Sequence, residues 1–191
     1  MDQGGQGQDV VGARERERPC YIDSCVIISL ALHDEKYQAA RSLVEKSQAA
    51  LTSAWGIVEV AATLHRRLKE EDALRWLRLP GDVRRLLKRG GPSFLVDYLL
   101  EYVIRDANVS ILDEDPESAQ LRIGNLTVRS PAVYRDAVDL APKLKLSTGD
   151  LLHIAYARRA SAACFATLDK DIVRRRSEIE EYTGISVLEG S

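Results

Sequence analysis

Short apolar segments with strand-like composition alternate with longer segments of helical character from residue 20 to the end of the sequence. This alternation predicts an α/β fold with a mostly parallel sheet, because parallel strands must be joined by crossovers that are usually helices. We expect four to five strands in the sheet. The segments with strand character are 20–22, 50–53, 109–112, 163–167 and 185–188.

The helical segments differ in how clearly they are bounded. Residues 54–69 carry apolar side chains at helical spacing and predict a long helix. Residues 70–108 predict three helices that are interrupted at Pro80-Gly81 and again at Gly90-Gly91-Pro92. The other expected helices cover 24–32, 36–47, 115–123, 131–140, 147–159 and 170–182.

The length of 191 residues suits one domain of ordinary size. Residues 1–18 lack apolar periodicity, so we predict a flexible tail there and a single domain at 19–191. Bulk charge gives no argument for nucleic-acid binding, because 27 Lys and Arg oppose 29 Asp and Glu for a formal net charge of −2. No apolar stretch approaches the roughly 20 residues of a membrane helix, and no signal peptide is recognisable, so we expect no membrane association.

The cysteines bear on the redox state of the chain. Cys20, Cys25 and Cys164 cannot form a disulfide framework and include no Cys-x-x-Cys pair. We therefore expect a reduced, cytoplasmic protein in which Cys25 and Cys164 act as small buried hydrophobic residues and Cys20 is partly exposed. No spacing of cysteine and histidine fits a zinc site.

Four acidic residues occupy positions that such a fold would bring together. Asp23 and Asp169 directly follow two expected strands, and the carboxyl ends of parallel strands share one edge of a sheet. Glu59 lies in the helix after the second strand, and Asp150 lies in the first turn of the helix before the fourth strand. Clustered carboxylates raise one another's pKa, and a divalent cation with a preference for oxygen ligands removes that cost. The fitting reaction is attack of a metal-activated water on a phosphodiester.

The motifs around these acids resemble those of PIN-domain ribonucleases, and most of all the VapC-type toxins of prokaryotic toxin–antitoxin pairs. The motifs are YIDSCVII with Asp23, SAWGIVEVAATLHR with Glu59, LSTGDLLHIAYA with Asp150 and FATLDKDI with Asp169. The resemblance covers roughly residues 20–69 and 109–188. It implies a three-layer α/β/α fold, Mg²⁺ with Mn²⁺ as a substitute, and endonucleolytic cleavage of single-stranded or structured RNA. It also implies frequent homodimers and, for a toxin, a cognate antitoxin.

Carried over residue by residue, the resemblance makes Asp23, Glu59 and Asp150 the core metal ligands and catalytic acids. Asp169 would be a fourth and more variable one. The separation between Glu59 and Asp150 is longer than a compact member of the family needs. We predict that the extra length forms helical insertions at 70–108 and 122–146.

Several further residues are weaker candidates. Ser24 and Thr167 lie close in sequence to Asp23 and Asp169 and could orient carboxylates or waters, and Asp171 could assist or replace Asp169. Basic residues near the site could contact RNA phosphates, although each could equally be a solvated surface residue. The candidates for RNA contact are Arg66, Arg67, Arg174 and Arg175.

Each acid also has a purely structural explanation. Asp23 and Asp169 could cap the helices that follow them, and Ser147-x-x-Asp150 resembles a capping box. Glu59 could be an exposed helix residue. The occurrence of all four acids in matching contexts favours the metal site over these separate explanations.

We therefore expect a metal-dependent endoribonuclease that acts as the toxin of a type II toxin–antitoxin pair. The alternatives are a PIN-fold protein in RNA processing or decay and a non-catalytic RNA- or protein-binding module. An aspartate-based phosphotransferase is disfavoured, because Cys25 stands where its D-x-D motif would place a second aspartate. The nuclease needs no histidine base, so we interpret His153 as a packed or surface residue, with a place at the edge of the cleft as the alternative.

Overall fold

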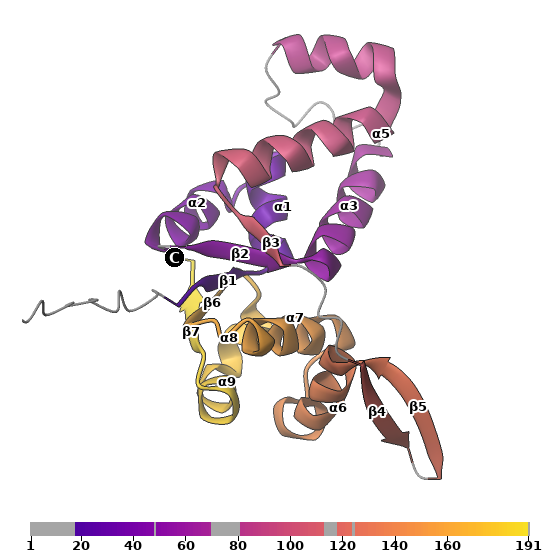
Figure 1. Ribbon diagram of the computed structural model, residues 1–191. Coiled ribbons are helices and arrows are strands. Elements are labelled where there is room, and N and C mark those ends of the chain that lie inside the picture. Colours follow the sequence, from indigo (N-terminus) through magenta and orange to yellow (C-terminus); the bar gives the residue numbers. More distant parts are fainter. Residues whose placement is uncertain (1–17, 48, 70–80, 113–117, 124, 191) are drawn as a thin grey trace, which may run out of the picture.

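A five-stranded parallel sheet lies at the centre of the molecule (Figure 1). The computed structural model describes residues 18–47, 49–69, 81–112, 118–123 and 125–190. The strands of the sheet are β1 (Cys20–Ile22), β2 (Ala50–Ser53), β3 (Ser110–Leu112), β6 (Cys164–Thr167) and β7 (Ser186–Glu189). Their order is β3-β2-β1-β6-β7, and every pairing is parallel. The predicted α/β fold with a parallel sheet of four to five strands is confirmed.

Helices cover both faces of this sheet. The described helices are α1 (Ser24–Leu32), α2 (Tyr37–Lys46), α3 (Ala54–Lys69), α5 (Gly81–Asp106), α6 (Ala132–Leu144), α7 (Thr148–Arg159), α8 (Lys170–Arg174) and α9 (Arg176–Thr183). In Figure 1, α1, α2, α3 and α5 lie on one side of the sheet, and α6, α7 and α9 lie on the other. The arrangement therefore has the three layers that were expected.

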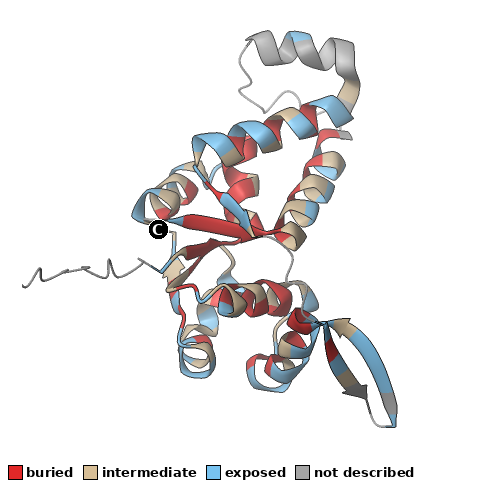
Figure 2. Ribbon diagram, viewed as in Figure 1, coloured by how far each residue is buried: buried red, intermediate tan, exposed pale blue. Residues whose placement is uncertain are grey.

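Two hydrophobic cores fill the spaces between these layers, as the buried residues in Figure 2 show. Successive side chains of a strand point to opposite faces of a sheet. Accordingly Ile22 packs in the core beneath α1, whereas its neighbour Tyr21 packs in the core with α6 and α7. Both side chains are completely buried. The central strand β1 is therefore held from both faces, and the residue that follows it is fixed in position.

The region before α6 differs from the prediction. The helix expected at 115–123 is wrong, because residues 118–123 form β4 (Ser118–Ile123) and pair antiparallel with β5 (Leu126–Pro131). The hairpin projects away from the central sheet in Figure 1. Apolar residues alternate with polar ones along β4, which is the period of a strand rather than of a helix. The predicted helical insertion at 122–146 is therefore helical only from Ala132 onward.

The other helix boundaries are close to those expected. Residues 70–80, with the first helix predicted in 70–108, lie outside the described residues. The break predicted at Gly90-Gly91-Pro92 is confirmed, because α5 consists of two helices that meet at a kink at Gly91, whose φ of 72° favours glycine. The single helix expected at 170–182 is divided into α8 and α9 at Arg175.

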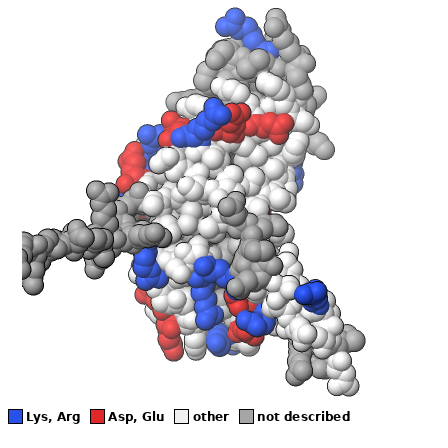
Figure 3. Space-filling model, viewed as in Figure 1, with Lys and Arg blue, Asp and Glu red and all other residues white. Residues whose placement is uncertain are grey.

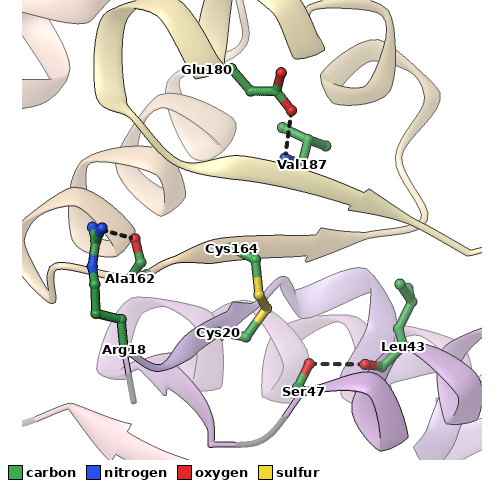
Figure 4. Close-up of a disulfide and its surroundings, with 8 residues drawn as sticks. All are labelled: Arg18, Cys20, Leu43, Ser47, Ala162, Cys164, Glu180 and Val187. Atoms are coloured by element: carbon green, nitrogen blue, oxygen red, sulfur yellow. Dashed lines mark hydrogen bonds between the residues drawn. A yellow bond between two sulfur atoms is a disulfide. The ribbon is translucent and has the colours of Figure 1, made fainter. Parts of the chain in front are cut away.

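A disulfide joins the two central strands (Figure 4). Cys20 of β1 and Cys164 of β6 are partners in the parallel register, with their Cα atoms 4.6 Å apart. The expectation of fully reduced cysteines is wrong for this pair, because 144 residues separate them and only the strand register brings them together. Cys20 is also buried rather than partly exposed. Arg18, which lies in the predicted tail 1–18, donates hydrogen bonds to the carbonyls of Ser161 and Ala162; the rest of that tail lies outside the described residues.

No helix among the described residues is both long enough and apolar enough to cross a membrane.

Candidate active site

The predicted acids lie around the carboxyl ends of β1 and β6. Asp23 directly follows β1, and Leu168 alone separates Asp169 from the end of β6. The two strands are hydrogen-bonded neighbours, and the backbone N–H of Asp23 donates to the carbonyl of Ala166 in β6 at 3.0 Å. Asp150 lies in the first turn of α7, and Glu59 lies in α3. The topology therefore brings segments that are distant in sequence to one edge of the sheet.

Asp23 is buried and bound by side chains from β6 and from the first turn of α1. Its exposed fraction is 4%. The Thr167 hydroxyl donates to Asp23 Oδ2 at 2.6 Å, and the Cys25 thiol lies 3.1 Å from the same oxygen. Thr167 Oγ1 also accepts a hydrogen bond from the backbone N–H of Asp169 at 2.9 Å, so one hydroxyl joins the two acidic positions. Asp23 makes no side-chain capping bond to α1, so helix capping does not account for this buried carboxyl.

The Cys25 thiol is a partly buried neighbour of this carboxyl group. Burial, and next the charge of Asp23, raise the pKa of Cys25 well above its ordinary value. The thiol therefore keeps its proton and can donate it to Asp23.

Glu59 is bound through one carboxylate oxygen. The Ser24 hydroxyl donates to Glu59 Oε2 at 2.6 Å, and His153 Nε2 lies 2.7 Å from the same atom. Hydrogen bonding to His153 lowers the pKa of Glu59, which favours the charged carboxylate. Glu59 is thus not the freely exposed helix residue of the structural explanation.

His153 is central to this network, although the sequence analysis did not include it among the site residues. Its exposed fraction is 1%, and Nε2 also lies 3.8 Å from Asp23 Oδ1. Burial acts to lower the pKa of His153, but the hydrogen bond to Glu59 and the charges of Asp23, Glu59 and Asp150 outweigh it, so the pKa is raised. The only sequence signal was its position three residues after Asp150, on the same helical face.

Asp150 and Asp169 are held mainly by local capping bonds. Ser147 Oγ accepts the Asp150 backbone N–H at 3.3 Å, as an N-cap residue does, and donates to Asp150 Oδ2 at 2.7 Å. The Asp169 carboxylate accepts the backbone N–H of Asp171 at 2.7 Å and caps α8. Burial raises the pKa of Asp150, and the charges of Asp169 and Asp23 raise it further. Capping is therefore part of their role, but these carboxylates also repel one another.

The donor set suits a hydrated divalent cation. Across the described residues, no three His, Cys, Asp or Glu side chains already converge closely enough to hold a metal ion. The acids nonetheless supply hard oxygen donors, and the charges that act on Asp150 would be offset by a cation. Mg²⁺ keeps several waters and binds through few carboxylates, so it does not require a closed set of protein ligands.

A cavity of about 440 Å³ adjoins Asp150. Its lining combines the loop before α7 with α8 and the residue after it: Lys145, Leu146, Ser147, Asp150, Asp171, Arg174 and Arg175. Arg174 pairs with Asp171 at 2.8 Å, and Arg175 pairs with Glu178 at 3.0 Å. Two of the basic residues proposed from the sequence therefore lie beside Asp150, together with Lys145, which was not predicted.

The other two basic candidates lie elsewhere. Arg66 and Arg67 are exposed near the end of α3, about two turns beyond Glu59, and do not line this cavity. On the face seen in Figure 3, acidic and basic side chains are interspersed over α2 and α5. Ion pairs there join Arg41 to Glu45 and Asp106. The surface over α2 and α5 is therefore of mixed charge, whereas Lys145, Arg174 and Arg175 line the cavity beside Asp150.

A match to a family model supports the family resemblance. The family model of the PIN domain matches residues 93–178. This segment contains Asp150 and Asp169 but not Asp23 or Glu59, which come before it in the sequence. The resemblance to PIN domains inferred from the motifs is thereby confirmed. No curated protein matches the chain. Among solved structures, the Mycobacterium tuberculosis toxin VapC20, described as cleaving the sarcin–ricin loop, is 12% identical with a TM-score of 0.48, over 81% of this chain and 93% of that one.

Proposed function

We propose that this PIN-domain protein is a metal-dependent endoribonuclease that hydrolyses RNA phosphodiester bonds. The observation that carries the proposal is the group of carboxylates at the ends of β1 and β6, where the charges of Asp23 and Asp169 act on Asp150. A protein with no use for a cation at this position would gain stability by replacing some of these acids, because uncompensated carboxylates repel. The family resemblance independently implies nuclease chemistry.

The proposed metal ligands are Asp23, Glu59 and Asp150, with Asp169 as a fourth acid, and Asp171 as an auxiliary. Mg²⁺, or Mn²⁺ in its place, would lower the pKa of a water and neutralise charge on the phosphate when bound. Within the chain, Thr167 and Ser24 would hold the carboxylates of Asp23 and Glu59 in place.

The cavity beside Asp150 is the proposed path of the RNA backbone. Lys145, Arg174 and Arg175 offer positive charge within reach of the acid that lies at its edge. Phosphate groups would compete with Asp171 and Glu178 for the two arginines, while Lys145 makes no ion pair with any described residue. Cations at this position would bring a backbone phosphate to the acids, and Arg66 and Arg67 would contact more distant parts of a bound RNA.

The biological setting follows from the same resemblance. We infer that the protein acts in the cytoplasm on single-stranded or structured RNA, as the toxin of a type II pair with a cognate antitoxin, and as a homodimer. The alternative is a PIN-fold protein of RNA processing or decay, or a non-catalytic binding module. Expression in a bacterial host distinguishes a toxin from these: the wild type should arrest growth, whereas Asp150→Asn should not. Equal growth of the two strains would contradict the toxin assignment.

Cleavage of an end-labelled RNA tests the nuclease directly. Wild-type protein would be incubated with Mg²⁺, with Mn²⁺ and with EDTA, beside Asp150→Asn and Asp139→Asn purified in parallel. Asp139 is an exposed aspartate of α6 and serves as the matched control. We expect internal cuts with either metal from the wild type and Asp139→Asn, and none with EDTA or from Asp150→Asn. RNA binding that survives EDTA without any product would favour the binding module instead.

A further inference from the structure

We propose that His153 is a positioning residue of the acidic site: its imidazole fixes the Glu59 carboxylate beside Asp23 and leaves the second oxygen of Glu59 available to a ligand. The inference rests on the proposed function and deepens it. It assigns a role to a buried side chain that the motifs alone did not distinguish from an ordinary packed histidine.

The first step is the set of contacts that the imidazole makes. Nε2 lies 2.7 Å from Glu59 Oε2, and Nδ1 lies 2.9 Å from the Tyr21 hydroxyl. A carboxylate only accepts hydrogen bonds, so Nε2 carries the proton that is donated to Glu59. In the neutral ring Nδ1 then accepts from the Tyr21 hydroxyl, and in the protonated ring it donates to that hydroxyl. Both ring nitrogens are satisfied, and the ring is held from two sides.

The second step is the support behind Tyr21. Its hydroxyl lies 2.6 Å from Ser53 Oγ, which accepts the backbone N–H of Gly56 at 3.1 Å. When the imidazole is neutral, the donors can be ordered along this series of hydrogen bonds, with Gly56 donating to Ser53, Ser53 to Tyr21, Tyr21 to His153 and His153 to Glu59. Burial raises the pKa of Tyr21, so its hydroxyl remains a donor. This buried chain fixes the imidazole through the start of α3, the same helix that carries Glu59.

The third step is that Gly56 leaves space for the His153 ring. A Cβ atom on Gly56 would lie 2.6 Å from Thr52 Oγ1 and 3.4 Å from His153 Cε1. Any larger residue at this position would press on the wall of the histidine pocket. The backbone at the start of α3 therefore accommodates the imidazole at close range.

The fourth step is the effect on Glu59. Ser24 and His153 both bind Oε2, whereas Oε1 accepts no hydrogen bond from the described residues. A Cβ atom on Gly149 would lie 3.4 Å from Oε1, so this oxygen faces the start of α7 immediately before Asp150. Without His153 the half-exposed Glu59 side chain would lose one of the two donors that select this orientation. The result would be a weaker ligand for a cation rather than a missing one.

The test compares His153→Phe, which removes the donor to Glu59, with His153→Gln, whose amide N–H can replace Nε2–H. Mn²⁺ affinity would be measured by calorimetry on each protein, together with kcat and KM for RNA. We expect His153→Phe to weaken Mn²⁺ binding roughly 10–100-fold and to lower kcat to a similar extent, as is typical when a partner of a metal ligand is removed. KM for RNA should be unchanged, and His153→Gln should recover most of the affinity. A folded His153→Phe with wild-type Mn²⁺ affinity would overturn the proposal, and so would a His153→Gln as defective as His153→Phe.

Tyr21→Phe provides a second test if the variants of His153 do not fold. It removes the hydroxyl that binds Nδ1 but keeps the ring stacked on Phe165, whose centroid lies 5.4 Å away. Mn²⁺ affinity should fall severalfold, and an unchanged affinity would contradict the proposal. Measurements on the wild type distinguish failure of the proposed nuclease from failure of the positioning role. If it neither binds Mn²⁺ nor cleaves RNA, the proposed nuclease fails, whereas normal wild-type activity with an unaffected His153→Phe overturns the positioning role alone.

Discussion

The two sides of the acidic site are held in different ways. Asp23 and Glu59 are each bound by groups that are distant in sequence: the Thr167 hydroxyl binds Asp23, and the Ser24 hydroxyl and the His153 imidazole bind Glu59, in a network that continues into the core through Tyr21. The Cys25 thiol adds a local contact to Asp23. Asp150 and Asp169 are bound mainly by residues two or three positions away in the sequence, within the first turns of α7 and α8. The first side is fixed by tertiary structure and the second by local capping.

This difference suggests a division of roles. The carboxylates on the fixed side keep their orientation whether or not a ligand is present, because buried partners determine it. The capped side adjoins the cavity with Lys145 and Arg174, where an RNA backbone would arrive, and capping bonds are easily exchanged for other ligands. We therefore interpret the fixed side as the anchor for a cation and the capped side as the part that adapts to cation and substrate.

Removing the buried acid should have the largest effect. Asp23→Asn deletes a charge on the fixed side but keeps a side chain of similar shape, so we expect cleavage to fall more than roughly 100-fold, beyond the loss typical for a partner of a metal ligand. The rate of RNA cleavage is the measurement, with Asp139→Asn as the control. A cleavage rate within a few-fold of wild type would remove Asp23 from the site.

Two serine substitutions compare the sides directly. Ser24→Ala removes a hydroxyl from Glu59, and we expect kcat to fall about tenfold. Ser147→Ala removes the cap of α7, which should cost about 1 kcal/mol of unfolding free energy and lower Tm by about 2–4 °C. Its kcat should change less than that of Ser24→Ala. If Ser147→Ala lowered kcat more than Ser24→Ala, catalysis would depend more on the orientation of Asp150 than on that of Glu59.

The basic residues that line the cavity should affect RNA binding rather than the cleavage step. Lys145→Ala and Arg174→Ala should each raise KM severalfold with little change in kcat, and each should reduce the slope of log affinity against log salt by about 1. Lys36→Ala, which removes an exposed cation outside the cavity, is the control. Salt dependence identical to that of wild type would exclude a phosphate contact at the substituted residue.

The smallest expected effect is on stability without metal. The pKa of Asp150 is raised, so its ionisation opposes folding as the pH rises above the ordinary value of 3.8. In EDTA at pH 7, Asp150→Asn should therefore raise Tm by roughly 1–3 °C after allowance for solvent screening, and this gain should vanish below about pH 4. Thermal unfolding across this pH range checks the prediction. A variant that is less stable than wild type at pH 7 would indicate that the Ser147 contact outweighs the repulsion.

The parts of the site that could be predicted are those with local signals. Asp23 and Asp169 follow apolar strands, and Ser147 stands at capping distance from Asp150, so each position can be read from its neighbours in the sequence. The chain from Glu59 through His153 to Tyr21 has no such signal. It depends on how α3 and α7 pack against β1, which the order of elements does not determine.

The same limit explains one of the two corrections to the fold, the disulfide, but not the other, the hairpin. The pairing of Cys20 with Cys164 requires the register of β1 against β6, which the composition of neither strand reveals. The hairpin of β4 and β5 has a local signal, the alternation of apolar residues, which the helix expected at 115–123 did not take into account. The alternating face of β4 buries Ala119, as the period of a strand predicts.

A Mn²⁺ titration of the purified protein tests the central claim most directly, because it needs no knowledge of the RNA target. Wild type, Asp23→Asn, Asp150→Asn and the control Asp139→Asn would be titrated by calorimetry under the same conditions. The account predicts that the wild type and the control bind Mn²⁺ alike and that both site variants bind it at least roughly tenfold more weakly. Equal Mn²⁺ affinity in all four proteins, or none in the wild type, would contradict a metal site at this edge of the sheet.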